Sequence, residues 1–189
     1  MNMYSAIQIA IISRNNFILH RKLYKKNELM TYSKFPLETK WPIDDIELSL
    51  VIPAYNEESR LLEMMVKTID FLKTTKLKYE IIIVNDGSND KTWHVINDIM
   101  KIKYPSENIL GLTYNKNGGK GWAVTSGLKY TRGKHILMVD ADGATPIEDY
   151  LKLKDQMDLI ESEQEASNNQ IGALIIGSRK IVQDETNKV

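Results

Sequence analysis

The sequence predicts an α/β protein with a mainly parallel sheet and helices on both faces. Continuous apolar segments of strand length alternate with segments in which apolar residues recur at helical spacing. Because the strand segments do not alternate between apolar and polar residues, we expect them to be buried on both faces, as in a parallel sheet covered by helices. Polar or glycine-rich motifs follow these segments, at the sheet edge where such proteins bind ligands.

The first strand and helix are expected just after the N-terminal quarter of the chain. Residues 48–52 are an apolar run that ends before Pro53, which is typical of a short buried strand. Asn56 follows and is a residue type that caps helices, with glutamates next to it that suit the positive end of a helix dipole. Apolar residues then recur at helical spacing as far as Leu72, so a helix capped by Asn56 is predicted.

The rest of the chain repeats this alternation of strand and helix. Further strands are expected at residues 79–84, 109–114, 135–139 and 171–177, and further helices around residues 95–100, at 122–130 and at 147–160. Residues 161–170 are polar and are expected to form a loop.

Residues 1–46 have no sustained hydrophobic period, so we expect an N-terminal extension in front of a domain of residues 47–189. The apolar stretch from Ala6 to Ile12 is too short for a spanning helix, which needs about 20 mostly apolar residues. The basic run from His20 to Lys26 fits either a solvated linker, which is favoured, or a membrane-proximal segment attracted to anionic lipid.

Charge and composition disfavour several classes of protein. The 189 residues include 25 Lys and Arg and 25 Asp and Glu, so the chain lacks the basic surplus of a general nucleic-acid binder. There is no Cys, which excludes disulfides, cysteine-ligated zinc and thiol nucleophiles. Only three His are present and none lies in an H-E-x-x-H motif, and we assign His94 and His135 no function.

Asp140-Ala141-Asp142 directly follows an expected buried strand. Carboxylates two residues apart at a strand end can reach one site, where one directs a ligand hydroxyl and the other holds a hard cation. Mg²⁺ or Mn²⁺ accepts one or two carboxylates and takes its other ligands from phosphate oxygens and water. An acidic turn is the alternative, but the position at a strand end favours a metal-diphosphate site.

Three further motifs could meet a phosphorylated ligand. The loop that contains Gly118, Gly119 and Lys120 permits close backbone approach and supplies a cation, although it is neither a P-loop nor a dinucleotide fingerprint. Asp86 could accept the N–H of a base or simply shape a turn. Arg179 could bind phosphate through its planar guanidinium or be an ordinary surface residue.

Four motifs in this order resemble glycosyltransferase family 2, which has the GT-A fold, a Rossmann-like α/β architecture. They are residues 51–58 (Val-Ile-Pro-Ala-Tyr-Asn-Glu-Glu), 84–88 (Val-Asn-Asp-Gly-Ser), 117–121 (Asn-Gly-Gly-Lys-Gly) and 140–142 (Asp-Ala-Asp). Residues 136–145 and the later Gly-Ser-Arg at 177–179 are similar to the members that use UDP-glucose and dolichyl phosphate. The resemblance covers about residues 47–180 and implies that residues 47–189 are the nucleotide-sugar-binding part of such a domain.

The resemblance also implies roles for individual residues. The implied nucleotide-sugar-binding residues are Pro53, Ala54, Tyr55, Glu57, Asp86, Gly119, Lys120 and Asp140, and the implied catalytic residues are Asp140, Asp142 and Arg179. Among these, Asp86 would meet the uracil, Asp140 the ribose or donor sugar, and Arg179 the phosphates. Asp142 would hold Mg²⁺ or Mn²⁺ on the diphosphate, with Lys120 nearby.

The implied reaction is transfer of glucose from UDP-glucose to dolichyl phosphate with inversion, at the endoplasmic reticulum membrane with the active site facing the cytosol. Members of the family continue well beyond the Gly-Ser-Arg element, so the fold is expected to be incomplete here, without the acceptor-binding half. The alternatives are transfer from GDP-mannose to a lipid phosphate, and a remnant that binds nucleotide sugar without activity. A nucleotidyltransferase is disfavoured by residues 53–58 and 140–145.

Overall fold

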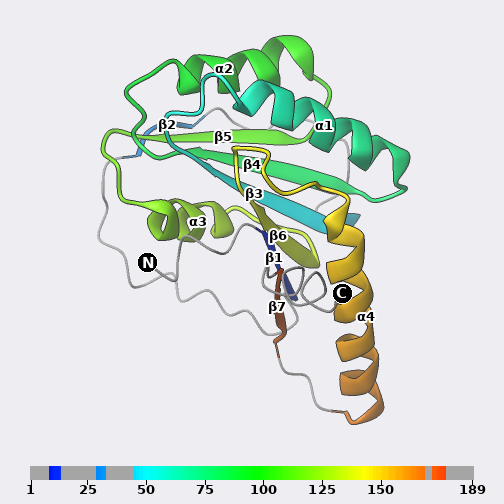
Figure 1. Ribbon diagram of the computed structural model, residues 1–189. Coiled ribbons are helices and arrows are strands. Elements are labelled where there is room, and N and C mark those ends of the chain that lie inside the picture. The colour runs from blue at the N-terminus through cyan, green and yellow to red at the C-terminus, as the bar shows by residue number, and fades with distance from the viewer. Residues whose placement is uncertain (1–8, 14–28, 33–44, 169–171, 178–189) are drawn as a thin grey trace, which may run out of the picture.

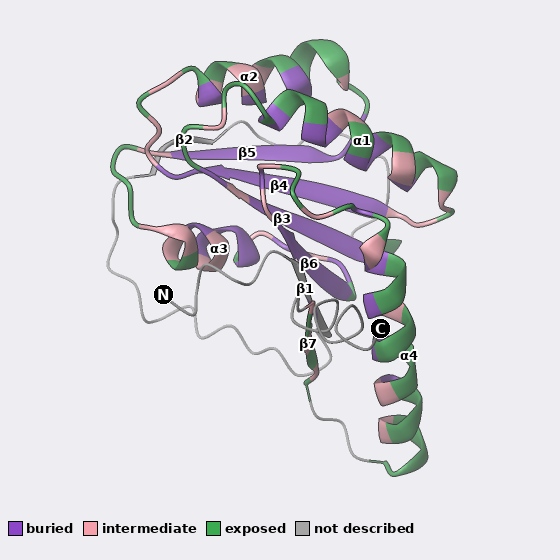
Figure 2. Ribbon diagram, viewed as in Figure 1, coloured by how far each residue is buried: buried purple, intermediate pink, exposed green. Residues whose placement is uncertain are grey.

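The computed structural model describes residues 9–13, 29–32, 45–168 and 172–177 (Figure 1). In this part of the chain one sheet has seven strands in the order β2-β5-β4-β3-β6-β1-β7. Four neighbouring strands run parallel: β5 (Ile109–Tyr114), β4 (Tyr79–Asn85), β3 (Leu48–Ala54) and β6 (His135–Val139). Almost every residue of these strands is buried, so the predicted parallel sheet with strands buried on both faces is confirmed (Figure 2).

Three strands joined by antiparallel pairing extend this parallel centre on its two sides. Strand β1 (Ile9–Ser13) pairs with β6 and with β7 (Leu174–Ile176), and β2 (Leu29–Tyr32) pairs with β5. The fully buried Ile11 joins the main core. Strands from the N-terminal 46 residues therefore belong to the sheet, which reaches across the boundary predicted between residues 46 and 47.

Helices cover both faces of the sheet, as predicted. They are α1 (Leu61–Thr74), α2 (Thr92–Asp98), the π-helix η3 (Ile99–Lys103), α3 (Lys120–Leu128) and α4 (Asp149–Ala166). On one face α1 packs with η3 and α4 on Ile81 and Ile83, whereas α3 packs on Ile82 and Val84. Because side chains alternate along a strand, these are opposite faces, and Figure 1 shows α1 and α3 on opposite sides of the sheet. No helix in the described ranges is both long and apolar enough to cross a membrane.

The prediction that Asn56 caps the first helix is wrong. Helix α1 begins at Leu61 after Arg60, and Asn56 has a left-handed φ of 56° in the loop before it. The side-chain oxygen of Asn56 instead accepts a hydrogen bond of 2.9 Å from the backbone N–H of Asn89. This side chain joins two loops, which local sequence patterns do not show.

The C-terminal elements also differ from the prediction. Helix α4 continues to Ala166, through most of the expected loop at 161–170. Glu161 explains the extension, because its buried carboxylate bonds His135 (Nε2, 3.0 Å) and Lys134 (Nζ, 2.7 Å) and so ties the end of the helix to β6. Strand β7 is shorter than predicted, and its residues Leu174 and Ile176 are exposed.

Gly127 sets how closely α3 approaches the sheet. A Cβ at this position would lie 2.6 Å from Cγ1 of Val51 and 3.1 Å from Cγ2 of Val84. We expect Gly127→Ala to lower the free energy of unfolding by about 1–3 kcal/mol, because an overpacked core forces its neighbours to shift. Gly121→Ala is the matched control on the same helix, since a Cβ there meets nothing within 4 Å. Urea unfolding measures both changes, and equal effects would contradict the close approach.

Candidate active site

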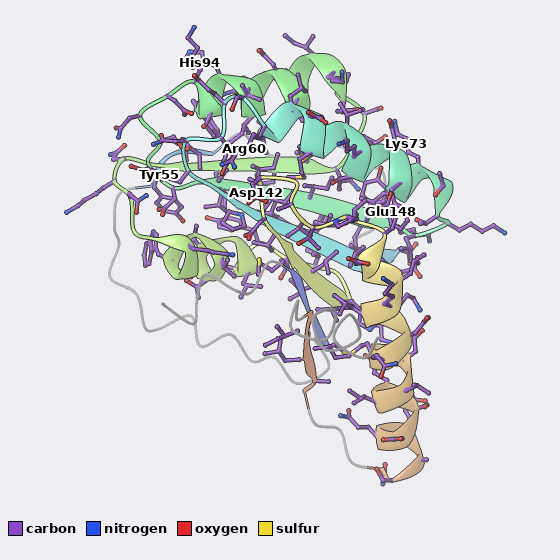
Figure 3. The ribbon with its side chains drawn as sticks, viewed as in Figure 1. Tyr55, Arg60, Lys73, His94, Asp142 and Glu148 are labelled. Carbon is purple, nitrogen blue, oxygen red and sulfur yellow. The ribbon has the colours of Figure 1, made fainter. Side chains whose placement is uncertain are left out.

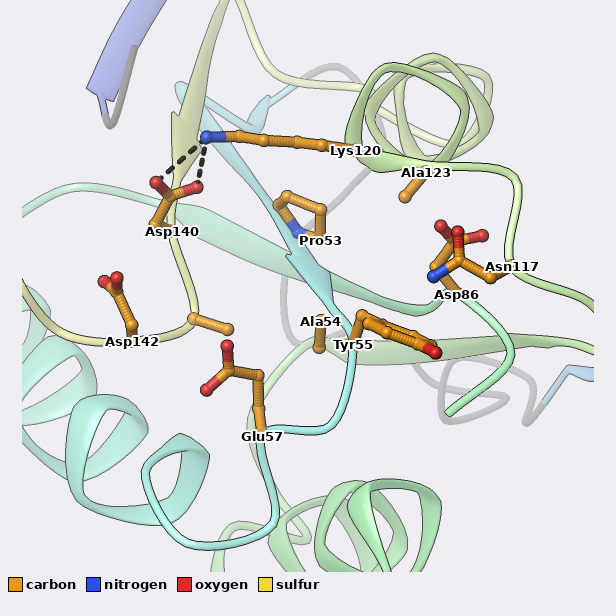
Figure 4. A pocket seen from close by; sticks show the side chains of 11 residues that line it. Pro53, Ala54, Tyr55, Glu57, Asp86, Asn117, Lys120, Ala123, Asp140 and Asp142 are labelled. Carbon is orange, nitrogen blue, oxygen red and sulfur yellow. Dashed lines mark hydrogen bonds and ion pairs between the residues drawn. The ribbon is translucent and has the colours of Figure 1, made fainter. Parts of the chain in front are cut away.

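A cavity of about 390 Å³ lies at the carboxyl edge of the parallel strands (Figure 4). The end of β3, the loops after β3, β4, β5 and β6, and the start of α3 line it. Its lining residues are Pro53, Ala54, Tyr55, Glu57, Asp86, Asn117, Lys120, Ala123, Asp140, Ala141 and Asp142. Eight of the ten residues proposed from the sequence are among them. Of the other two, Gly119 lies beside the cavity without lining it, and Arg179 lies outside the described residues.

Asp86 holds the glycine-rich loop in place. Its buried carboxylate accepts the backbone N–H of Gly118 at 2.9 Å on Oδ1 and that of Gly119 at 2.7 Å on Oδ2. Burial raises the pKa of Asp86, and these two hydrogen bonds oppose the rise. Gly119 has a φ of 89°, a conformation that suits glycine. Asp86 therefore fixes the loop that precedes α3, and it also lines the cavity.

Lys120 and Asp140 form an ion pair across the cavity. Lys120 is the first residue of α3 and Asp140 follows β6. The Lys120 Nζ lies 2.6 Å from Oδ1 and 2.9 Å from Oδ2 of Asp140, as the dashed lines in Figure 4 show. Both side chains remain partly exposed to the cavity. The ammonium group of Lys120, which the family resemblance implies lies near a diphosphate, is thus inside the pocket. It is paired with Asp140, the first aspartate of the Asp-Ala-Asp motif.

Three carboxylates line the same end of the cavity. Beside Asp140 lie Asp142, whose Oδ1 accepts the N–H of Ala144 at 2.9 Å, and Glu57. Burial raises the pKa of Glu57; the nearby Arg60 lowers it, and the negative charges of Asp142 and Asp140 raise it further. The Glu57 side chain is only 13% exposed. This end of the pocket is therefore strongly acidic and favours a ligand that brings or binds a cation.

The donor set fits a divalent cation that is shared with a ligand. No group of three or more His, Cys, Asp or Glu side chains within the described ranges is arranged to hold a metal ion alone. Mg²⁺ and Mn²⁺ bind through one or two carboxylates when substrate phosphates and water supply the other oxygens. Asp142 fits that role, because it lines the cavity and its carboxylate is not occupied by Lys120.

The sequence did not single out Ala123 or the second cavity. Ala123 lies one helical turn beyond Lys120, and this i, i+3 spacing could have identified it as facing the same pocket. A second cavity of about 400 Å³ shares Asp142 with the first and lies between α1 and the loop before α4. Its side chains carry both charges, including Arg60, Lys67 and Glu148, so it favours no single class of ligand.

The fold and the pocket define an α/β protein with an acidic ligand site at the carboxyl edge of a parallel sheet. The chain belongs to glycosyl transferase family 2, whose model matches residues 49–165. This confirms the family resemblance and the expected GT-A fold class.

Relatives with assigned names are similar over most of the chain. It is 44% identical over 158 residues to the dolichyl-phosphate beta-glucosyltransferase of Dictyostelium discoideum, covering 80% of this chain and 46% of that one. It is 40% identical over 126 residues to the Homo sapiens enzyme of the same name, covering 64% and 39%. The chain thus spans about half the length, or less, of these relatives. Among solved structures, Staphylococcus aureus TarS 1–349 is 25% identical, with a TM-score of 0.46, covering 62% of this chain and 33% of that one.

Proposed function

We propose that this chain is the donor-binding part of a glycosyltransferase that transfers glucose from UDP-glucose to dolichyl phosphate. The product would be dolichyl β-D-glucosyl phosphate, which serves protein N-glycosylation. The 44% identity to a dolichyl-phosphate beta-glucosyltransferase carries the choice of substrates. The pocket supports it, because it gathers acidic side chains and a lysine at the edge where a nucleotide diphosphate would bind.

The reaction would be one in-line displacement with inversion. A phosphate oxygen of dolichyl phosphate attacks C1 of the glucose, the bond from C1 to the β-phosphate oxygen breaks, and UDP leaves with the electron pair. The transition state resembles an oxocarbenium ion, as in other glycosyl chemistry. A phosphate monoester has a second pKa near ~6, so the nucleophile is already largely anionic at neutral pH and needs no strong base. The main demand on the protein is to stabilise the departing diphosphate.

The described residues can meet that demand. Asp86 would accept the N–H of the uracil while it holds the glycine-rich loop. The ammonium group of Lys120 would exchange its partner, from the carboxylate of Asp140 to the diphosphate. Asp140 could then accept a hydroxyl of the ribose or the sugar. A divalent cation, Mg²⁺ or Mn²⁺, held by Asp142 would offset the negative charge of the leaving group. Arg179, which lies outside the described residues, would add a further positive charge beside the phosphates.

The proposal places the enzyme at the endoplasmic reticulum membrane, with its active site facing the cytosol. Dolichyl phosphate is a lipid, so the acceptor would reach the site from a membrane surface. No nucleic-acid partner is proposed, because the chain has no basic surplus.

Two other functions remain within the same family. Transfer from GDP-mannose to a lipid phosphate would use the same acidic pocket. A protein that binds nucleotide sugar without transferring it would also use this pocket, and it would bind the donor without forming a glycosylated lipid.

Calorimetry on the 189-residue chain tests the donor and the metal. We expect UDP-glucose to bind in the presence of Mg²⁺ or Mn²⁺, more tightly than GDP-mannose, and to lose about tenfold or more in affinity when EDTA removes the metal. Preference for GDP-mannose would favour the mannose alternative. Absence of binding to a folded chain would contradict the proposed donor site.

A further inference from the structure

The loop between β3 and α1 carries Tyr55 and Glu57, which line the pocket. Its backbone is hydrogen-bonded to residues that do not line the pocket. Three successive amides of this loop donate to side chains of the neighbouring segment that joins β4 to α2. They are the N–H groups of Asn56 (to Ser88 Oγ, 3.0 Å), Glu57 (to Thr92 Oγ1, 2.8 Å) and Glu58 (to Asp90 Oδ2, 3.1 Å). The three acceptor residues are therefore Ser88, Asp90 and Thr92.

The contact is reciprocal. The backbone N–H of Asn89 donates to Oδ1 of Asn56 at 2.9 Å, and that of Lys91 donates to Oε2 of Glu58 at 2.7 Å. Five hydrogen bonds thus join two loops that are more than 30 residues apart in sequence. Side chains that satisfy backbone amides in this way fix loop geometry. The bond from Glu57 to Thr92 is the partly buried one of the five, so its loss would leave a polar group poorly paired.

Asp90 determines the direction of the hydrogen bond that the Thr92 hydroxyl donates. The Thr92 hydroxyl lies 2.5 Å from Oδ1 of Asp90, and the Thr92 backbone N–H donates to the same oxygen at 2.9 Å. A hydroxyl has one hydrogen to donate, and a carboxylate only accepts. The Thr92 hydroxyl must therefore donate to Asp90, which leaves its oxygen lone pairs for the N–H of Glu57. Thr92 is fully buried, so its hydroxyl has no water as a substitute partner.

Glu57 is also fixed at its other end. Its Oε1 accepts a hydrogen bond of 2.7 Å from Nη2 of Arg60. Its Oε2 is buried and has no hydrogen-bond partner among the described residues. Figure 4 shows the Glu57 side chain beside the cavity, on the side of Asp142. A buried carboxylate oxygen without a partner is costly, so this atom is an acceptor that a ligand can satisfy.

We propose that Asp90 and Thr92 are positioning residues that hold Glu57 so that its Oε2 accepts a hydroxyl of the bound donor. This inference rests on the proposed function, which supplies a nucleotide sugar with hydroxyls on its ribose and on its glucose. Neither Asp90 nor Thr92 lines the pocket, so both act through Glu57.

A double-mutant cycle measured by calorimetry with UDP-glucose and Mn²⁺ tests the proposal. We expect Glu57→Gln to weaken binding about tenfold, because Arg60 takes the single amide oxygen and an NH₂ group then faces the donor. Thr92→Val should weaken binding by a similar factor, and Thr92→Ser, which keeps the hydroxyl, should restore it. The double variant Glu57→Gln/Thr92→Val should bind no more weakly than Glu57→Gln alone, because both changes remove the same contact.

Thr131→Val is the matched control. Thr131 is also buried, and its hydroxyl donates to a backbone carbonyl, that of Leu128, at the end of α3 away from the pocket. This variant should leave the affinity for UDP-glucose unchanged, and thermal unfolding reports any loss of stability in each variant.

The outcomes separate the inference from the proposed function. Losses that add in the double variant, or a Thr92→Val variant that binds like the wild type, would overturn the positioning role. A wild-type chain that is folded but does not bind UDP-glucose would instead overturn the proposed donor. Repeating the cycle with UDP identifies the hydroxyl: a loss seen with both ligands assigns it to the ribose, and a loss seen only with UDP-glucose assigns it to the glucose.

Discussion

Asp142→Ala is expected to abolish the gain in UDP-glucose affinity that Mg²⁺ or Mn²⁺ provides, and to lower glucosyl transfer by about 10²–10³-fold. Asp142 is a cavity carboxylate that Lys120 leaves available, and no cluster among the described residues could hold the ion without the ligand's oxygens. Removal of this carboxylate would leave the leaving diphosphate without its cation. Calorimetry with metal and with EDTA, followed by a transfer assay with dolichyl phosphate in detergent, measures both effects.

Asp149→Ala is the control for this change. Asp149 is an aspartate at the start of α4 that pairs with Lys152 at the surface and lines neither cavity. The Asp149→Ala variant should keep the full metal dependence of UDP-glucose binding, because an exposed ion pair contributes little to stability. If Asp142→Ala kept the metal-dependent gain in affinity, Asp142 could not be the metal ligand.

Lys120→Met is expected to weaken UDP-glucose binding by about ten- to a hundredfold while it leaves the affinity for uridine unchanged. In the free protein the ammonium group neutralises Asp140, and in the complex it would neutralise the diphosphate. The variant loses the cation and leaves the negative charge of Asp140 facing the phosphates. Lys120→Arg keeps the charge and should lose less. Calorimetry with UDP-glucose and with uridine provides the comparison.

Lys129→Met tests whether any lysine of this region has the same effect. Lys129 follows α3, and its Nζ lies 5.6 Å from the ring centroid of Trp122, away from the pocket lining. It should bind UDP-glucose like the wild type. An equal loss of uridine and UDP-glucose affinity in Lys120→Met would show that the lysine shapes the loop rather than binding phosphate.

The four parallel strands could be predicted because each leaves a pattern in its own short stretch of sequence. Each central strand is a short, continuous apolar run, and burial on both faces leaves that pattern in the sequence itself. Strand β1 could not be predicted in this way. The apolar stretch from Ala6 to Ile12, which overlaps β1, indicates by itself only a segment too short to span a membrane. The partner of β1 in the sheet, His135–Val139, lies far away in the sequence.

The clustering of the candidate residues in one cavity could be predicted because one geometric rule governs it. Parallel strands end at a common edge, so residues such as Asp86 and Asp140, which each follow a strand, had to meet there. The partners of these residues could not be predicted. That Asp86 binds two glycine amides, and that Asn56 joins two loops instead of capping a helix, depends on tertiary contacts that no local pattern encodes.

The position of β1 links the two ends of the described chain. Strand β7 is paired with β1, and β1 lies between β7 and β6. Because β1 is antiparallel to both neighbours, β7 runs in the same direction as β6. Strand β7, which precedes the Gly-Ser-Arg motif in sequence, is therefore held in the sheet by the first of the described strands. A shortened protein that kept the whole family match at residues 49–165 but lacked residues 9–13 would have lost the template on which its last strand assembles.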